Sequence, residues 1–181
     1  MRNEYRIEGD TTVILCRRAT GNIIETLIDT VDIPRADAFQ RAWNANWYPT
    51  VHNYRISGHI TRNKRVLLYR WLLDPPAHLQ VDHINRNTLD NRRLNLRLVT
   101  NAENHQNLTS ATSTNRTSGV RGVVWSKMYQ AWVVSYKLNQ KYHHVGRYDD
   151  LDEAIKASVE ARRKAMPFST EDFATATGSS R

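Results

Sequence analysis

The chain has 181 residues, a formal net charge of +8 and 40% hydrophobic residues, so it can bury a core and wholesale disorder is excluded. No apolar run reaches the length of a membrane span, and the first ten residues lack a signal-peptide segment. We therefore expect a cytoplasmic protein with no membrane partner. A single cysteine, Cys16, excludes an internal disulfide and a cysteine-rich metal site, so no structural zinc is expected.

Residues 1–75 are predicted to form a mixed β region with one short helix. A turn signal, ATGN, separates two β-branched runs, TTVILCR and NIIETLID. The short helix is expected to open at Pro34, because proline is favoured at the first helical position. Further strands, or a strand leading into a helix, are expected in YPTVHNYRISGHI and KRVLLYRWLL. Trp43, Trp47 and Trp71 are predicted to fill the core, and base stacking is the alternative role for Trp47 or Tyr48.

Positive charge is concentrated in the middle of the chain. Between residues 50 and 148 there are 15 Lys or Arg and 4 Asp or Glu, whereas both ends have a slight acidic excess. Neutralisation of phosphates dominates the affinity of proteins for nucleic acids. A nucleic acid is therefore the favoured partner, although charge alone would also fit a ribosome-like or membrane-surface protein.

The segment at residues 76–108 begins within DPPAH, where two prolines prevent regular structure. One strand is expected in VDHIN and a second in LNLRLVT, and a helix is expected to open with Asn101 as its N-cap. In an extended segment the neighbours Asp82 and His83 point to opposite faces. Such a pair suits phosphodiester hydrolysis, because one side chain can hold a metal while the other activates a water.

This segment resembles the His-Asn-His (HNH) nuclease motif, the ββα-metal fold, and especially its branch in phage and intron-encoded homing endonucleases. The resemblance is carried by Asp82, His83, Asn95, Leu96, Glu103, Asn104 and Asn107. It implies that His83 is a general base and that Asp82 and Asn104 are metal ligands. It also implies that Asn95 braces the loop so that the histidine is oriented. An Asp–His pair alone is common in structural roles, so the signal is the pair together with asparagines 12 and 21 positions after His83.

The chemistry of these residue types agrees with the implied roles. An Asp and an Asn oxygen form a hard ligand set, which favours one Mg²⁺ or Mn²⁺ over Zn²⁺. A neutral histidine has a pKa near the operating pH and can accept a proton from water. Further candidates in the helix are Asn107 and His105. Three other asparagines are expected to shape the loop or touch phosphate: Asn85, Asn87 and Asn91. Four arginines are expected to bind phosphates or stabilise developing charge: Arg86, Arg92, Arg93 and Arg97.

Residues 109–118 are small and polar, which predicts a linker or an arm that tracks DNA, with Arg116 as a DNA contact. Residues 119–168 are predicted to form a three-stranded antiparallel sheet backed by one helix. Short turns separate its three runs, VRGVVWS, QAWVVSYKL and KYHHVGRY. The helix, LDEAIKASVEARRKAM, has acidic residues at its start and basic residues near its end, which matches the helix dipole. The tail at 169–181 is expected to fray.

The 119–168 segment resembles the DNA-binding domain of plant ethylene-response factors, the Apetala-two type. The residues that carry this resemblance are Gly119, Val120, Arg121, Gly122, Val123, Trp125, Trp132, Gly146, Arg147, Tyr148, Glu153 and Ala154. It implies a sheet that enters the major groove and touches bases and backbone. The expected DNA contacts are Arg121, Trp125, Lys127, Trp132, Lys137 and Arg147. The alternative for Trp125 or Trp132 is a place in the core.

The sequence therefore predicts an α+β protein with a mixed N-terminal β region, a ββα-metal nuclease core and a three-stranded antiparallel sheet packed on one helix. We expect a metal-dependent endonuclease of the homing type, encoded by a phage or an intron, that nicks or cuts double-stranded DNA as a monomer. Two alternatives stay open. One is a DNA-binding regulator with a catalytically inactive HNH fold, and the other is a nuclease that processes branched DNA or RNA.

Overall fold

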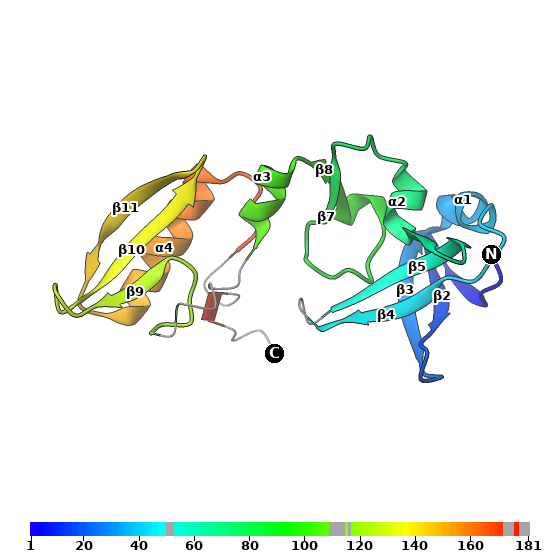
Figure 1. Ribbon diagram of the computed structural model, residues 1–181, viewed down its shortest axis with the longest axis horizontal. Coiled ribbons are helices and arrows are strands. Elements are labelled where there is room, and N and C mark those ends of the chain that lie inside the picture. The colour runs from blue at the N-terminus through cyan, green and yellow to red at the C-terminus, as the bar shows by residue number, and fades with distance from the viewer. Residues whose placement is uncertain (50–52, 109–114, 116, 172–175, 178–181) are drawn as a thin grey trace. The chain divides into compact units, whose positions relative to one another are not determined.

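The chain is described here by a computed structural model (Figure 1). The described residues are 1–49, 53–108, 115, 117–171 and 176–177. Two compact units, Met1–Thr100 and Asn101–Arg181, make up the chain. Arg116, most of the predicted linker at 109–118 and much of the tail at 169–181 lie outside the described residues. Within the described part of the chain, no helix is long and apolar enough to cross a membrane.

The first unit is built on a curled, mixed, six-stranded sheet (Figure 1). Its strand order is β1-β2-β4-β5-β6, and β3 pairs with β2. All pairings are antiparallel except one parallel contact, between Arg17 of β2 and Asn44 of β4. The strands are β1 (Tyr5–Glu8), β2 (Thr11–Arg17), β3 (Ile23–Asp29), β4 (Asn44–Tyr48), β5 (Asn53–Thr61) and β6 (Lys64–Leu67).

The core of this unit lies between the sheet and two short helices. The helical elements of the unit are η1 (Thr30–Asp32), α1 (Ile33–Asp37), α2 (Leu68–Leu73) and η3 (Arg93–Asn95). Trp43 is fully buried and stacks on Phe39, with ring centroids 4.2 Å apart. A Cβ at position 58 would lie 2.2 Å from the Phe39 ring, which explains the glycine on β5. Trp71 packs against the same cluster.

Trp47 does not fill the core, and this prediction was wrong. Its side chain is 43% exposed, and its ring meets the Tyr54 ring edge-on, with centroids 4.9 Å apart. The reason is its place near the end of the β4–β5 hairpin, two residues past Ala45, the last residue of β4 in the buried cluster. The alternative of base stacking stays a prediction.

A separate antiparallel ribbon follows, formed by β7 (Gln80–His83) and β8 (Leu96–Val99). The long loop between these strands docks on β3 of the large sheet. There Leu27 makes two backbone hydrogen bonds of 2.8 Å, donating to Leu89 and accepting from Asn91. The loop is therefore anchored to a strand that precedes it by more than fifty residues.

The second unit is a three-stranded antiparallel sheet with a helix packed on one face (Figure 1). Its strand order is β11-β10-β9, and Val123, Val134 and Ile155 lie in the core between the sheet and α4. The elements of this unit are α3 (Asn101–Asn104), η4 (His105–Asn107), β9 (Val123–Ser126), β10 (Ala131–Leu138), β11 (Lys141–Tyr148) and α4 (Leu151–Ala165). The predicted α+β class, with a mixed β region and a sheet packed on one helix, is confirmed.

A buried ion pair fastens α4 of this unit. Arg162 is 1% exposed and donates to Glu171, which is 3% exposed, at 2.8 Å from Nε and 2.5 Å from Nη2. Nη1 of the same arginine donates to the carbonyl oxygen of Arg121 at 2.7 Å. Gly122 is required beside it, because its φ is +79° and a Cβ would lie 2.4 Å from the Ser135 carbonyl oxygen. The guanidinium thus links the helix, the chain before β9 and the C-terminal segment.

Replacing Glu171 by Gln is expected to destabilise the second unit by about 3 kcal/mol, because it leaves the buried Arg162 charge without a counter-ion. Hydrogen exchange of the α4 amides along a urea series measures this loss. The matched control is Glu160→Gln, which breaks the exposed pair with Lys164 on the same helix and should change nothing measurable. Equal exchange rates of the α4 amides in both variants would contradict the stabilising role of the Arg162–Glu171 pair.

Candidate active site

Asp82 and His83 are buried neighbours at the end of β7, and they face different surroundings. Asp82 lies opposite Arg97 of β8, whose Nε and Nη2 donate to its Oδ2 at 2.9 and 2.7 Å. His83 lies opposite Leu96, and its ring meets Tyr69 of α2 edge-on, with centroids 5.0 Å apart. Successive strand residues point to opposite faces, so the ribbon presents a carboxylate and an imidazole on different sides.

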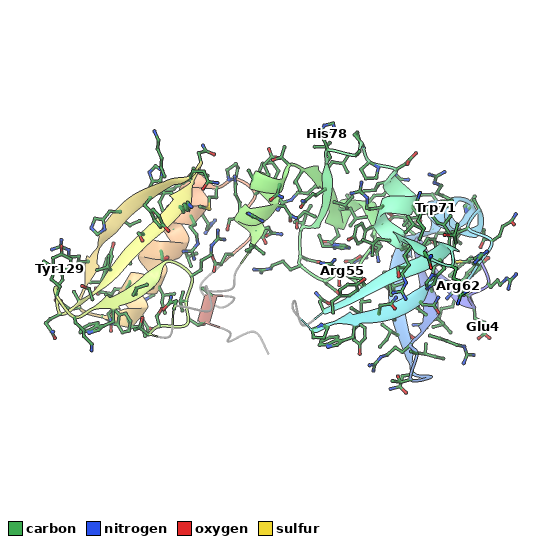
Figure 2. The ribbon with its side chains drawn as sticks, viewed as in Figure 1. Glu4, Arg55, Arg62, Trp71, His78 and Tyr129 are labelled. Carbon is green, nitrogen blue, oxygen red and sulfur yellow. The ribbon has the colours of Figure 1, made fainter. Side chains whose placement is uncertain are left out.

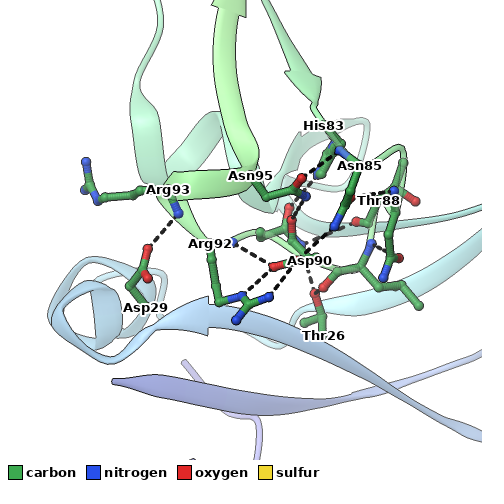
Figure 3. Close-up of polar contacts among 12 residues, drawn as sticks. Thr26, Asp29, His83, Asn85, Thr88, Asp90, Arg92, Arg93 and Asn95 are labelled. Carbon is green, nitrogen blue, oxygen red and sulfur yellow. Dashed lines mark hydrogen bonds and ion pairs between the residues drawn. The ribbon is translucent and has the colours of Figure 1, made fainter. Parts of the chain in front are cut away.

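A chain of buried hydrogen bonds leads from the imidazole back to the large sheet (Figure 3). Nε2 of His83 lies 3.1 Å from Oδ1 of Asn91, which is fully buried. Nδ2 of Asn91 donates to the Thr26 hydroxyl of β3 at 2.8 Å, and that hydroxyl donates to the Leu89 carbonyl oxygen at 2.7 Å. The single hydroxyl proton of Thr26 is used on Leu89, so Thr26 must accept from Asn91. The Asn91 oxygen therefore faces the histidine.

This chain determines which nitrogen of His83 carries the proton. An amide oxygen only accepts, so Nε2 of the neutral ring is protonated and Nδ1 is the ring's proton acceptor. Burial lowers the pKa of His83, and the charge of Arg55 adds to that effect, while the hydrogen bond to Asn91 and the charges of Asp82 and Asp90 oppose it. The neutral form, which can act as a base, is thereby favoured.

Asn95 spans the loop that follows His83. Its Nδ2 donates to the Asp90 carbonyl oxygen at 2.7 Å, and its Oδ1 accepts from the Asn85 amide at 2.8 Å. The Asn85 side chain in turn donates to the Asp90 carboxylate at 3.1 Å. An asparagine offers a donor and an acceptor on one short side chain, which is what a brace between two backbone segments needs. Its contacts are those of a loop brace.

Three of the four arginines expected at phosphates form ion pairs within the first unit. The pairs are Arg92 with Asp90, Arg93 with Asp32 and Arg97 with Asp82, at 2.6 to 2.7 Å. Their charge is partly neutralised, and they hold the loop and ribbon in place. The fourth, Arg86, turns the chain after β7 at a φ of +64°, where its amide donates to the His83 carbonyl oxygen at 2.9 Å.

Asn104, His105 and Asn107 belong to the second unit. Asn104 is the last residue of α3, and the other two lie in η4. Asn107 is buried and accepts a hydrogen bond from the Thr170 hydroxyl at 2.7 Å. Their assignments as a metal ligand and as additional site residues stay predictions from the sequence.

Two of the tryptophans expected to contact DNA lie on the side of the sheet that packs on α4. Trp125 and Trp132 are paired across β9 and β10, and their rings meet edge-on at 5.1 Å. By strand alternation they share a face with Val123 and Val134, which are core residues, and Trp132 packs on that core. The position of Trp132 therefore matches the alternative, a place in the core.

The basic residues of this sheet have varied surroundings. Arg147 lies opposite Val133 on the other face, with its guanidinium 3.4 Å from the Tyr129 ring centroid. Nζ of Lys137 lies 5.6 Å from the Tyr142 ring centroid, and the Lys127 carbonyl oxygen accepts a hydrogen bond from the Gln130 side chain in the β9–β10 turn. These positions leave the predicted DNA contacts of the three residues untested.

Arg121 is tied to the backbone of its own unit. Its guanidinium donates to the carbonyl oxygens of His105 and Gln106, each at 3.2 Å, and to that of Leu108. Burial lowers the pKa of Arg121, and the nearby charge of Arg162 acts in the same direction. The side chain thus holds η4 against the chain before β9.

The donors of the first unit suit a hard cation. Asp82 is the metal ligand that the sequence predicts in this unit, and its carboxylate is an oxygen donor of the kind that Mg²⁺ or Mn²⁺ prefers. Over the residues that the structure describes, no group of three or more His, Cys, Asp or Glu could hold a metal ion. An ion with so few protein ligands keeps most of its positions for water and phosphate oxygens.

Asn91, Thr26 and Tyr69 were not singled out as functional residues from the sequence. Asn91 was expected only to shape the loop or touch phosphate. Thr26 carried no signal at all, because it lies 65 residues before its partner Asn91 and on a different strand.

Comparisons with known proteins identify the family to which this segment is similar. A family model described as HNH endonuclease matches residues 75–106, which include both strands of the ribbon and α3. Protein 3.8 of Escherichia phage T7 is 34% identical over 89 residues, which cover 49% of this chain and 71% of that protein. No solved structure matches. The chain therefore carries an HNH endonuclease domain and belongs to the same family as Protein 3.8 of phage T7.

Proposed function

We propose that the protein is a metal-dependent DNA endonuclease in which His83 is the general base for hydrolysis of a phosphodiester bond. The observation that carries the proposal is the hydrogen-bond chain from Thr26 through Asn91 to His83. It holds a buried, neutral imidazole in the tautomer that has Nδ1 as its acceptor. A base that takes a proton from water needs these properties.

In the proposed mechanism Nδ1 of His83 accepts a proton from the attacking water. The Asn95 brace and the Asn91 amide keep the ring oriented while the proton moves. Asp82 is the proposed metal ligand of the first unit, and the assignment of Asn104 as a second ligand rests on the sequence alone. A bound Mg²⁺ or Mn²⁺ would polarise the phosphate and stabilise the leaving oxygen.

We also propose that the second unit binds double-stranded DNA. Residues 108–148 contain six Lys or Arg and no Asp or Glu, which supports a polyanionic partner. The resemblance to ethylene-response-factor domains supports the same assignment. The homing type is proposed from the sequence resemblance, and the phage relative agrees with a phage origin. One site per chain predicts that a monomer nicks one strand in each encounter.

Replacing His83 by Ala is expected to reduce nicking of a supercoiled plasmid at least 100-fold with Mg²⁺ or Mn²⁺, because the general base is lost. DNA binding in a gel-shift assay should be unchanged. The matched control is His78→Ala, an exposed histidine five positions earlier (Figure 2), which should nick normally. Retained nicking by His83→Ala would remove the base assignment. If the wild-type chain binds DNA but does not nick it with any divalent metal, the alternative of a DNA-binding regulator with an inactive HNH fold would be favoured.

Replacing Thr26 by Val is expected to lower kcat for nicking about ten-fold, because it removes the acceptor that fixes the Asn91 amide. The KM for DNA should not change. Thr12→Val is the matched control, since Thr12 is also fully buried and its hydroxyl makes one bond, to Thr30 at 3.0 Å. Both variants are expected to lose about 1–3 kcal/mol of stability. A similar fall of kcat in both would show a general effect of stability instead.

Replacing Asp82 by Asn is expected to raise the metal concentration for half-maximal nicking about 10-fold or more, because an anionic ligand becomes neutral. EDTA should abolish nicking by the wild-type chain. The matched control is Asp32→Asn, a buried carboxylate that pairs with Arg93 and lies outside the proposed site. Coincident metal titrations for wild type and Asp82→Asn would rule out the ligand role.

A further inference from the structure

We propose that Arg55 binds a backbone phosphate of the DNA beside His83. Arg55 lies on β5, outside the 75–106 segment that the family model matches. The inference rests on the proposed nuclease function and adds a substrate-binding residue to that site. It follows from the place of Arg55 in the first unit, from its neighbours and from its charge.

Arg55 lies on the side of the β4–β5 hairpin away from the core. Its neighbour Ile56 is buried, so strand alternation turns Arg55 to the opposite face, beside Tyr48. Its guanidinium lies 4.7 Å from the Tyr48 ring centroid. Figure 2 shows Arg55 between the hairpin and the β7–β8 loop.

The loop after His83 is held on the same part of β5. The Asn53 side chain donates to the Arg86 carbonyl oxygen at 3.4 Å, and the Thr88 hydroxyl donates to the Tyr54 carbonyl oxygen. The bonded residues lie just before Arg55 on β5 and just after His83 on the loop. The start of β5 is therefore next to the β7–β8 loop that follows His83.

Arg55 lies near the aromatic ring that contacts the imidazole. Tyr69 lies edge-on to His83, with ring centroids 5.0 Å apart. Burial raises the pKa of Tyr69, and the Arg55 charge opposes that rise. Arg55 therefore belongs to the same neighbourhood as the two rings.

This positive charge is not neutralised within the described residues. Arg55 forms no ion pair or hydrogen bond there, whereas Arg92, Arg93 and Arg97 each hold a carboxylate. Its contact with an aromatic ring orients the guanidinium without cancelling the charge.

A phosphate is the ligand that this arrangement requires. The Arg55 guanidinium is oriented by the Tyr48 ring and has no carboxylate partner among the described residues, so an anion is needed to balance its charge. A phosphodiester supplies that anion, and the planar guanidinium can donate two hydrogen bonds to its oxygens.

Arg55→Gln tests the proposal through binding and cleavage. In EDTA, the slope of log K against log salt concentration should become shallower by about 0.9, the value for one lost phosphate contact. With Mg²⁺, the nicking rate should fall about 100-fold. The matched control is Arg18→Gln. The Arg18 guanidinium lies 5.2 Å from the ring centroid of Tyr54, which precedes Arg55 on β5 and points to the other face of the strand. The control variant should keep both the slope and the rate.

A second variant, Arg55→Lys, keeps the charge but loses the planar fork. It should keep the salt slope while nicking falls about ten-fold, and it serves also if Arg55→Gln fails to fold. A wild-type slope and rate in Arg55→Gln, or equal losses in Arg18→Gln, would overturn the proposal while leaving the nuclease function intact. If Arg55→Gln changes the salt slope but the wild-type chain does not nick DNA, the phosphate contact is supported and the nuclease function is rejected.

Discussion

The hydrogen bond between Asn91 and His83 makes the candidate site depend on the large sheet of the first unit. Thr26 fixes the side chain of Asn91, and Leu27 fixes its backbone, so a single strand, β3, orients the imidazole. Because Asn91 is fully buried, each of its polar atoms must keep a partner or lose about 1–3 kcal/mol. The N-terminal sheet therefore acts as the template on which the nuclease loop is assembled.

Local rules were enough to predict part of this site. The opposite directions of Asp82 and His83 follow from the two-residue period of a strand. The role of Asn95 as a loop brace came from the resemblance to the HNH motif instead, and its observed contacts span that loop. The fold class was predicted correctly because hydrophobic period and turn signals are local properties.

The other features depend on contacts between distant residues. Arg93 pairs with Asp32, which lies 61 positions earlier, and no spacing rule indicates that partner. The exposure of Trp47 follows from its place near the end of the β4–β5 hairpin, past the buried cluster. Alternation predicted that Trp132 and Val134 share a face, but it could not say that α4 covers that face.

The neutral partner of His83 has a consequence for repeated turnover. A carboxylate in the place of Asn91 would hold the imidazolium strongly after the proton has moved. The amide oxygen holds it far more weakly, and the buried surroundings favour the uncharged ring. In the proposed mechanism, the histidine would therefore pass its proton on and return to its starting state before the next phosphodiester arrives.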